Sequence, residues 1–300
     1  MGGCAMRFEP TSTSKKFPRS TRGPLVTAAM VVLLLGLAAL SGTAAVASRS
    51  SRPVYQPPRS YYLALGDSMA YGFQPTKRPG ARPSVFNTGY VDVLAARLRR
   101  LSPKIRVVNY GCPGESTVTF ARGGCPAFAD GFKLHDAFRG PQLKAVESFL
   151  RAHPGQVSPI TLTLWGGDLA PLSARGKRAQ REIASFASRF TSILKRLRAT
   201  APTAEIIVTG AWNPEADRLA QVEPLYRSLD TAIKRAATAS RARVANMFAA
   251  LNGPGNFKAQ QARLCSLTFM CSKGDPHPTD AGYRAMAEAF MAASGYPRKR

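Results

Sequence analysis

The stretch YYLALGDS (residues 61–68) places a short apolar run directly before a glycine, an aspartate and a serine. An apolar run of this length, bounded by turn-forming residues, predicts a buried β-strand, here Tyr61–Leu65. Polar residues that follow such a strand lie at its carboxyl end, which is where open α/β sheets bind their ligands. The stretch therefore predicts both a first strand and the region of the sheet in which functional residues are expected.

Apolar runs of the same kind recur along the chain and alternate with helical patterns. Four further strands are expected, at Ile105–Asn109, Ile160–Trp165, Glu205–Gly210 and Arg243–Met247. Apolar residues at helical spacing predict helices around 91–101, 140–152, 183–197, 222–239 and 283–290. Strands separated by helices pair in parallel through right-handed crossovers. The sequence thus predicts an α/β fold, a three-layer α/β/α sandwich with a parallel sheet of about five strands, as one domain over residues 61–300.

The predicted loops at the strand ends carry residues suited to acyl transfer. Ser68 follows the first strand, and the stretch DPHP (residues 275–278) precedes the last helix. A serine hydroxyl becomes a nucleophile when a base removes its proton, and a histidine base needs an acid that holds its tautomer. Side chains two residues apart on an extended stretch point to one side, so Asp275 can orient His277. Taken singly, Ser68 is equally typical of a helix cap and His277 of a turn.

Two of these stretches resemble blocks of the SGNH/GDSL hydrolases. LGDS (residues 65–68) is similar to their first block and DPHP (275–278) to their last, and the resemblance extends over about residues 60–294. It implies a flavodoxin-like α/β/α fold and a carboxylic ester hydrolase, an esterase or lipase that works through an acyl-enzyme. Ser68 would be the nucleophile, His277 the base and Asp275 the acid, one residue closer to the histidine than in many members. No metal or organic cofactor is implied.

The oxyanion hole is where the sequence departs from the family. The family combines the serine N–H, a glycine N–H from a second block and an asparagine side chain from a third. NYGCPGES (residues 109–116) resembles the second block and makes Gly114 the glycine donor beside Ser68. WGGD (165–168) stands where Gly-x-Asn-Asp is usual, so Gly167 takes the place of the asparagine; a one-residue shift would put Asp168 there. Losing one donor slows such enzymes by about 10²–10³-fold, and Asn213 is a candidate substitute.

Aromatic residues near the predicted strand ends are candidates for a substrate pocket. Tyr110, Trp165 and Trp212, with Asn213, are expected to line an acyl or sugar site, or else to be plain core. The resemblance implies an acyl-ester substrate, either a lipid or an acylated saccharide. The sequence does not choose between them.

Four cysteines outside the N-terminal segment predict disulfides. Cys112, Cys125, Cys265 and Cys271 are an even number, which suits an oxidising compartment. Three pairings are possible, and the local pairs Cys112–Cys125 and Cys265–Cys271 are the simplest. Zinc is the competing interpretation, but neither pair has C-x-x-C spacing and no histidine stands in a ligand pattern. No metal site is therefore expected.

The N-terminal segment predicts export. Basic residues precede the uncharged stretch LVTAAMVVLLLGLAAL (residues 25–40), and AVA (45–47) follows it. This order is typical of a signal peptide over residues 1–47. A retained anchor is the alternative, because the uncharged residues 23–47 approach the ~20 that a membrane span needs. Residues 48–60 (SRSSRPVYQPPRS) predict a linker. The protein is expected to be secreted or anchored at the outer face of the cytoplasmic membrane.

The charge of the chain indicates anionic partners. Forty-two basic and 17 acidic residues leave +25, and the residues after 47 retain about +21. A hydrophobic content of 45% excludes a disordered polycation. Zinc-finger spacing and RNP-type motifs are missing, so nucleic acid is not expected. An anionic cell envelope or membrane surface is the expected neighbour. The alternative function is a weak or inactive SGNH-fold module that binds anionic envelope polymers.

Overall fold

The computed structural model describes residues 57–169 and 176–296, all within one compact unit. The predicted signal peptide or anchor (residues 1–47) and most of the predicted linker lie outside these residues. Over the described ranges, no helix combines the length and the apolar character needed to cross a membrane.

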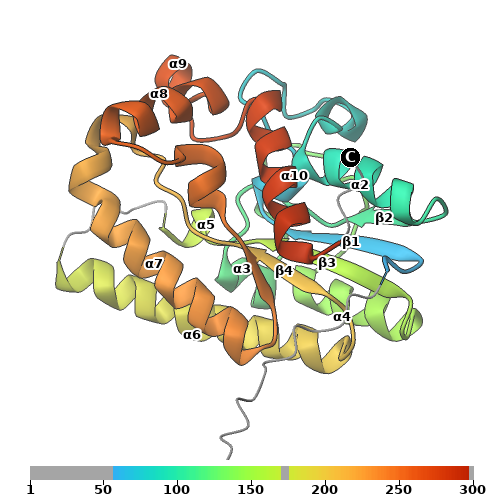
Figure 1. Cartoon of the computed structure of the whole chain (residues 1–300). Helices are drawn as coiled ribbons and strands as arrows, with labels where there is room; N and C mark the ends of the chain where they lie inside the picture. Colours follow the sequence, from blue (N-terminus) through green and yellow to red (C-terminus); the bar gives the residue numbers. More distant parts are fainter. Residues whose placement is uncertain (1–56, 170–175, 297–300) are drawn as a thin grey trace, which may run out of the picture. The chain divides into compact units, whose positions relative to one another are not determined.

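The described strands form a parallel sheet in the order β2-β1-β3-β4-β5 (Figure 1). Their bounds are β1 (Tyr61–Gly66), β2 (Arg106–Asn109), β3 (Val157–Thr163), β4 (Ile206–Thr209) and β5 (Arg243–Ala245). Each lies at a predicted place, although β3 begins and ends earlier than Ile160–Trp165. Every residue of β1, β3 and β4 is buried, whereas the edge strands β2 and β5 are partly exposed. This is the flavodoxin-like order, and it confirms the predicted fold class.

Helices cover both faces of the sheet and make it the middle layer (Figure 1). One face packs against α2 (Tyr90–Leu101), α8 (Phe257–Leu267) and α10 (Asp280–Ser294). The other packs against α3 (Thr117–Arg122), α4 (Gln142–Ala152), α6 (Lys177–Thr200) and α7 (Leu219–Ala239). Short helices line the loops: α1 (Ser68–Tyr71), η1 (Pro83–Phe86), η2 (Pro126–Phe128), α5 (Gly166–Leu169), η3 (Ala216–Arg218), η4 (Phe248–Asn252) and α9 (Met270–Lys273).

The end of the predicted linker is attached to this domain. The backbone N–H of Arg59 donates to the Ser158 carbonyl (2.9 Å) and so continues the pairing of β1 with β3. The Arg59 guanidinium donates to the carbonyl of Gly155 and the hydroxyl of Thr203, both at 3.0 Å. The strand pairing with β3 therefore includes Arg59, two residues before the apolar run of β1.

Candidate active site

The three residues expected to form a triad are hydrogen-bonded in series. The Ser68 hydroxyl lies 2.7 Å from His277 Nε2, and Nδ1 of the same ring lies 2.7 Å from Asp275 Oδ1. Asp275 Oδ1 also accepts the backbone N–H of His277 (2.8 Å), which holds the carboxylate beside its own ring. Ser68 follows β1 and the other two precede α10, so the fold brings together two ends of the domain.

The acid–base loop is held extended by the chain around it. Pro278 forms an antiparallel bridge with Thr268, and the Phe269 N–H donates to the His277 carbonyl (3.0 Å). A disulfide between Cys265 and Cys271 ties α8 to α9 directly before this loop. Because the backbone is extended, the side chains of Asp275 and His277 point to the same side of it.

The turn that presents Ser68 requires its glycine. Gly66 has a φ of 115°, and a Cβ there would lie 1.8 Å from the carbonyl oxygen of Thr163 on the neighbouring strand β3. Asp67 then caps α1 by accepting the Met69 N–H (3.0 Å) and also accepts the Thr163 hydroxyl (2.8 Å). The serine therefore stands on a turn that β3 braces from one side.

The second block (residues 109–116) is hydrogen-bonded through Asn109 to the short helix α1, which begins at Ser68. Its side-chain amide donates to the Ala70 carbonyl (2.9 Å), and its side-chain oxygen accepts the Gly111 N–H (2.8 Å). A Cβ on Gly111 would lie 2.3 Å from the Tyr71 nitrogen, so only glycine allows this approach. The Cys112–Cys125 disulfide closes the same loop. Both disulfides are thus the predicted local pairs.

The three expected oxyanion donors line one cavity. Ser68, Gly114 and Gly167 all belong to its wall. Within the described part of the chain, none of their backbone N–H groups donates a hydrogen bond. These three N–H groups therefore lie in one cavity wall without a hydrogen-bond acceptor among the described residues.

The backbone of Gly167, in the third block, packs so closely on Glu115, in the second block, that residue 167 has no room for a side chain. A Cβ on Gly167 would lie 2.4 Å from the Glu115 carbonyl oxygen. Asp168, the alternative from a one-residue shift, points away from the cavity: its carboxylate accepts the Thr117 N–H (2.7 Å) and the Arg189 guanidinium (3.0 Å). Gly167, and not Asp168, therefore lines the cavity that Ser68 also lines.

Two of the four predicted pocket residues lie elsewhere. Trp165 and Trp212 line the cavity, but Tyr110 packs against Phe138 and Phe149 outside it. Asn213 is fully buried, and its side-chain amide donates to the Leu219 carbonyl (3.0 Å). Because that amide is bound to the first residue of α7 and Asn213 does not line the cavity, Asn213 does not replace the missing asparagine.

A buried glutamate and glutamine that the sequence reasoning did not single out connect the two loops. Gln142, at the start of α4, pairs with both backbone groups of Gly66 (2.7 and 3.0 Å) and donates to the Glu115 carboxylate (2.9 Å). The Glu115 and Gln142 side chains are both fully buried. Through these hydrogen bonds, Gln142 links Glu115, which follows Gly114, to Gly66 in the turn before Ser68. Only the placement of Glu115 inside the second block gave a signal for this link.

Burial shifts the carboxyl groups around the nucleophile. It raises the pKa of Asp67 to about 6 and that of Glu115 to about 7, since a charge is costly away from water. Burial also acts to raise the pKa of Asp275, but the hydrogen bonds and the charge of His277 outweigh it and leave that pKa below its usual value. Asp275 is therefore the carboxylate of the site that stays ionised most readily.

The cavity at the triad measures about 730 Å³ and extends from Phe73 and Phe132 to Trp212 and Tyr226. Within residues 57–169 and 176–296, no group of three or more His, Cys, Asp or Glu is arranged to hold a metal ion.

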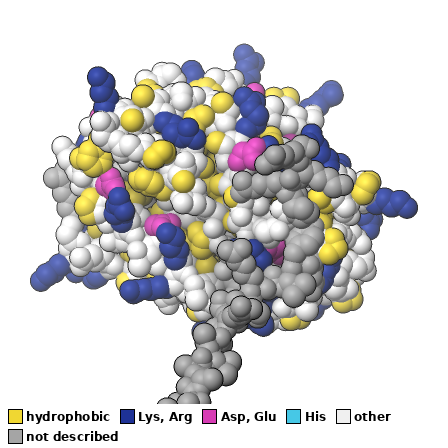
Figure 2. All heavy atoms as spheres, in the orientation of Figure 1, with side chains coloured by type: hydrophobic (Ala, Val, Ile, Leu, Met, Phe, Trp, Pro, Cys, Tyr) yellow, Lys and Arg dark blue, Asp and Glu magenta, His cyan; other side chains and the backbone are white. Residues whose placement is uncertain are grey.

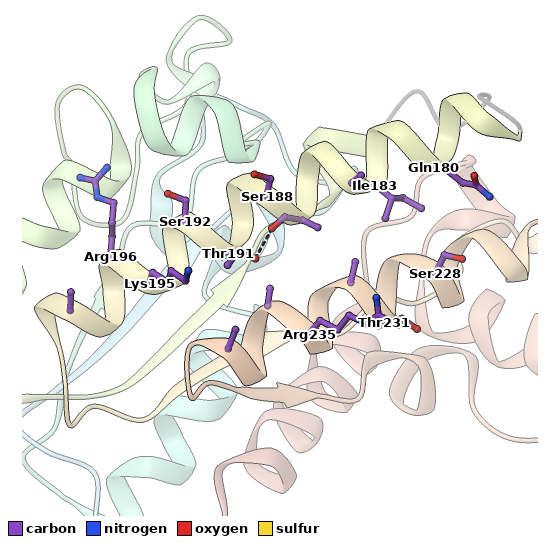
Figure 3. Close-up of a pocket in the computed structure, with 16 residues that line it drawn as sticks. Gln180, Ile183, Ser188, Thr191, Ser192, Lys195, Arg196, Ser228, Thr231 and Arg235 are labelled. Atoms are coloured by element: carbon purple, nitrogen blue, oxygen red, sulfur yellow. Dashed lines mark hydrogen bonds between the residues drawn. The ribbon is translucent and has the colours of Figure 1, made fainter.

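A second hollow of about 1050 Å³ lies between α6 and α7 (Figure 3). Small and basic residues line it, Ser188, Thr191, Lys195 and Arg235 among them, and the Thr191 hydroxyl donates to a carbonyl of its own helix. Its lining includes no His, Cys, Asp or Glu.

A parallel α/β/α sandwich with serine, histidine and aspartate in series at the carboxyl ends of its strands has the architecture of an SGNH-type hydrolase. The chain belongs to the GDSL-like lipase/acylhydrolase family, which it matches over residues 64–285. It is accordingly a carboxylic ester hydrolase.

Solved structures agree on the fold. The acetylxylan esterase Axe2 from Geobacillus stearothermophilus is 17% identical, with a TM-score of 0.52 over 80% of this chain and 97% of that one. LAE5, an α/β hydrolase from the Lake Arreo metagenome, is 18% identical, with a TM-score of 0.53 over the same shares. No protein of curated function matches the sequence significantly.

Proposed function

We propose that the protein is an exported serine esterase that cleaves carboxylic esters through an acyl-enzyme on Ser68. The observation that carries this proposal is the unbroken series of hydrogen bonds from Ser68 through His277 to Asp275, 2.7 Å at each step. Ser68 and His277 line a cavity large enough for an ester substrate.

The reaction proceeds in two balanced halves. Ser68 Oγ attacks the ester carbonyl carbon while its proton passes to His277 Nε2, and the carbonyl electrons move onto oxygen. Collapse of this intermediate breaks the bond to the alcohol oxygen, which takes the proton from His277. Water then attacks the acyl-enzyme, again giving its proton to His277, and release of the acid returns that proton to Ser68. Asp275 stays ionised and stabilises the imidazolium in both halves.

The developing oxyanion is stabilised by backbone groups in place of an asparagine. The free N–H groups of Ser68, Gly114 and Gly167 lie in the same cavity wall. Donors aimed at the oxyanion act strongly where water is excluded, and each is worth about 10²–10³ in rate. Gly167 supplies a backbone N–H at the position where the third block of the family has an asparagine side chain. The enzyme therefore needs no contribution from Asn213 to turn over its substrate.

The decisive experiment compares the purified protein with Ser68→Ala on p-nitrophenyl esters. We expect Ser68→Ala to lose at least a thousandfold in kcat and to resist labelling by a fluorophosphonate, which should add one adduct to the wild-type protein at Ser68. Ser188→Ala, an exposed serine on α6, is the matched control and should behave as wild type. Equal rates for wild type and Ser68→Ala would favour the alternative of a binding module without turnover.

We infer that the exported protein stays near an anionic surface of the cell envelope. Lys and Arg side chains protrude all around the face in Figure 2, with few acidic ones between them, and the chain carries +25 overall. Such a charge concentrates a protein at a polyanion, and salt weakens the attraction. Washing cells with increasing salt should release the protein into the medium. A partition that ignores ionic strength would refute this localisation.

A further inference from the structure

Aromatic side chains divide the cavity into two halves on either side of the nucleophile. Phe73 and Phe132 are neighbours (ring centroids 6.0 Å apart) and follow α1 and η2, which belong to the β1 and β2 side of the sheet. Trp165 lies 6.1 Å from Trp212 and 6.2 Å from Tyr226, beyond the ends of β3 and β4. Since β1 stands between β2 and β3, Ser68 is positioned between the two groups.

The histidine decides which half receives the alcohol. The leaving oxygen takes its proton from His277, so the alcohol must lie on the side of that ring. The Phe73 ring packs edge-on against His277 with centroids 4.6 Å apart. The exposed Asp130 also belongs to this half, which leaves it open to polar groups and water. The acyl substituent is then directed toward the tryptophans.

The tryptophan half is lined mainly by apolar side chains. Trp212 is 2% exposed, Tyr226 5% and Met286 1%. The charged side chains on this side, Glu215 and Arg218, bind one another at 2.8 Å. A set of large apolar side chains encloses the space: Met69, Trp165, Trp212, Tyr226, Met270 and Met286. We call these six residues the acyl chamber.

We propose that the acyl chamber receives the acyl chain, and that the substrates are esters of medium-chain fatty acids and not acetates. The inference rests on the proposed function. A chain that starts at Ser68 after β1 and reaches Trp212 after β4 crosses two strand spacings of about 4.8 Å each, which corresponds to roughly six to eight carbons.

A chain-length series tests the proposal on the full-length protein. With p-nitrophenyl acetate, butyrate, hexanoate and octanoate below their critical micelle concentrations, kcat/KM should rise with length, by up to about fourfold for each added CH2 that becomes buried. A profile that is highest on acetate would overturn the inference while leaving the esterase intact. Failure of every ester, or equal rates with Ser68→Ala, would instead sink the proposed function.

Substitutions then test the location. Trp212→Leu enlarges the chamber and should move the optimum to longer chains, whereas Met286→Phe narrows it and should move the optimum to shorter ones. Tyr110→Leu makes a comparable change outside the cavity and should leave the octanoate-to-acetate ratio of kcat/KM unaltered. Unchanged ratios in folded Trp212→Leu and Met286→Phe would refute the assignment.

Binding to inactive protein gives a readout that does not depend on those variants. Octanoate should raise the melting temperature of Ser68→Ala more than acetate does at equal concentration. Equal shifts for the two acids would contradict the proposal even if the chamber variants did not fold.

Discussion

The backbone of Gly167 packs so closely on Glu115 that a Cβ at residue 167 would lie 2.4 Å from the Glu115 carbonyl oxygen. Gly114, the residue before Glu115, lines the cavity at Ser68, and its N–H donates no hydrogen bond among the described residues. The glycine in the third block is therefore a requirement of how the two loops meet. An asparagine could not be introduced here without moving the oxyanion donor.

Gly167→Ala should lower kcat by about 10²-fold or more, because the added methyl group displaces the Gly114–Glu115 backbone and costs an oxyanion donor. Gly166→Ala is the matched control, since its Cβ would meet only Asp67 Oδ2, at 3.8 Å. Steady-state kinetics on both variants, with circular dichroism to verify folding, decide the matter. Equal losses in the two variants would argue against a special role for the contact.

Asp275→Asn should lower kcat by about 10³–10⁴-fold with little change in KM, because an amide can neither hold the His277 tautomer nor stabilise the imidazolium. Asp217→Asn makes the same chemical change at an exposed position outside the cavity and should be silent. A folded Asp275→Asn enzyme with wild-type kcat would remove Asp275 from the triad.

Glu115→Gln should flatten the pH dependence of stability. The folded pKa of Glu115 is raised to about 7 from a usual 4.5, so the folded state binds its proton more tightly. Its contribution to the free energy of unfolding is fully present below pH 4.5 and is lost as the pH rises through 7. At about 1.4 kcal/mol per pKa unit, the loss is on the order of 3 kcal/mol.

Urea unfolding between pH 4.5 and 8.5 measures this effect. The wild-type free energy of unfolding should fall more steeply across that range than the Glu115→Gln value, with Asp217→Asn following the wild type. Parallel profiles for wild type and Glu115→Gln would show that Glu115 does not titrate in this way.

Replacing Cys112 and Cys125 together by alanine should weaken both stability and turnover. The 13-residue separation predicts a loss of about 3 kcal/mol from chain entropy, and the freed loop carries Gly114. The Cys265→Ala/Cys271→Ala double variant loosens the acid–base loop instead and should cost about 2 kcal/mol.

Both disulfide variants are assayed at a temperature where circular dichroism still reports a folded protein. We expect kcat to fall there in each of them. Wild-type kcat in both folded variants would mean that the disulfides stabilise the domain without shaping the site.

Local patterns were sufficient for most of the architecture. The apolar runs predicted the five described strands close to their observed places, and the central strands β1, β3 and β4 gave the clearest signal because they are buried on both faces. Ser68, Asp275 and His277 were predictable for a related reason: strand ends and an extended Asp-x-His stretch determine where side chains point. The bond of Arg59 to Ser158 is a strand pairing that local composition does not encode.

Contacts between loops distant in sequence escaped prediction. Tyr110 and Asn213 were expected at the pocket. Tyr110 packs instead against the rings of Phe138 and Phe149, and the Asn213 side chain donates to the Leu219 carbonyl. Gln142 lies 76 residues from Gly66 and nevertheless pairs with both of its backbone groups. Such partners depend on how helices and loops pack in three dimensions, and no pattern of neighbouring residues reports them.

The sequence by itself predicted the parallel α/β/α fold, and its resemblance to the SGNH/GDSL hydrolases implied the roles proposed for Ser68, His277 and Asp275. The fold prediction follows from apolar runs that alternate with helical patterns, whereas the cysteine pairing stayed open among three possibilities until the structure showed the local pairs. Only the tertiary structure decided that Gly167 must remain a glycine and that Asp168 faces away from the cavity. It also decided that the tryptophans lie on one side of Ser68. All three features depend on distances between loops that meet only when the sheet assembles.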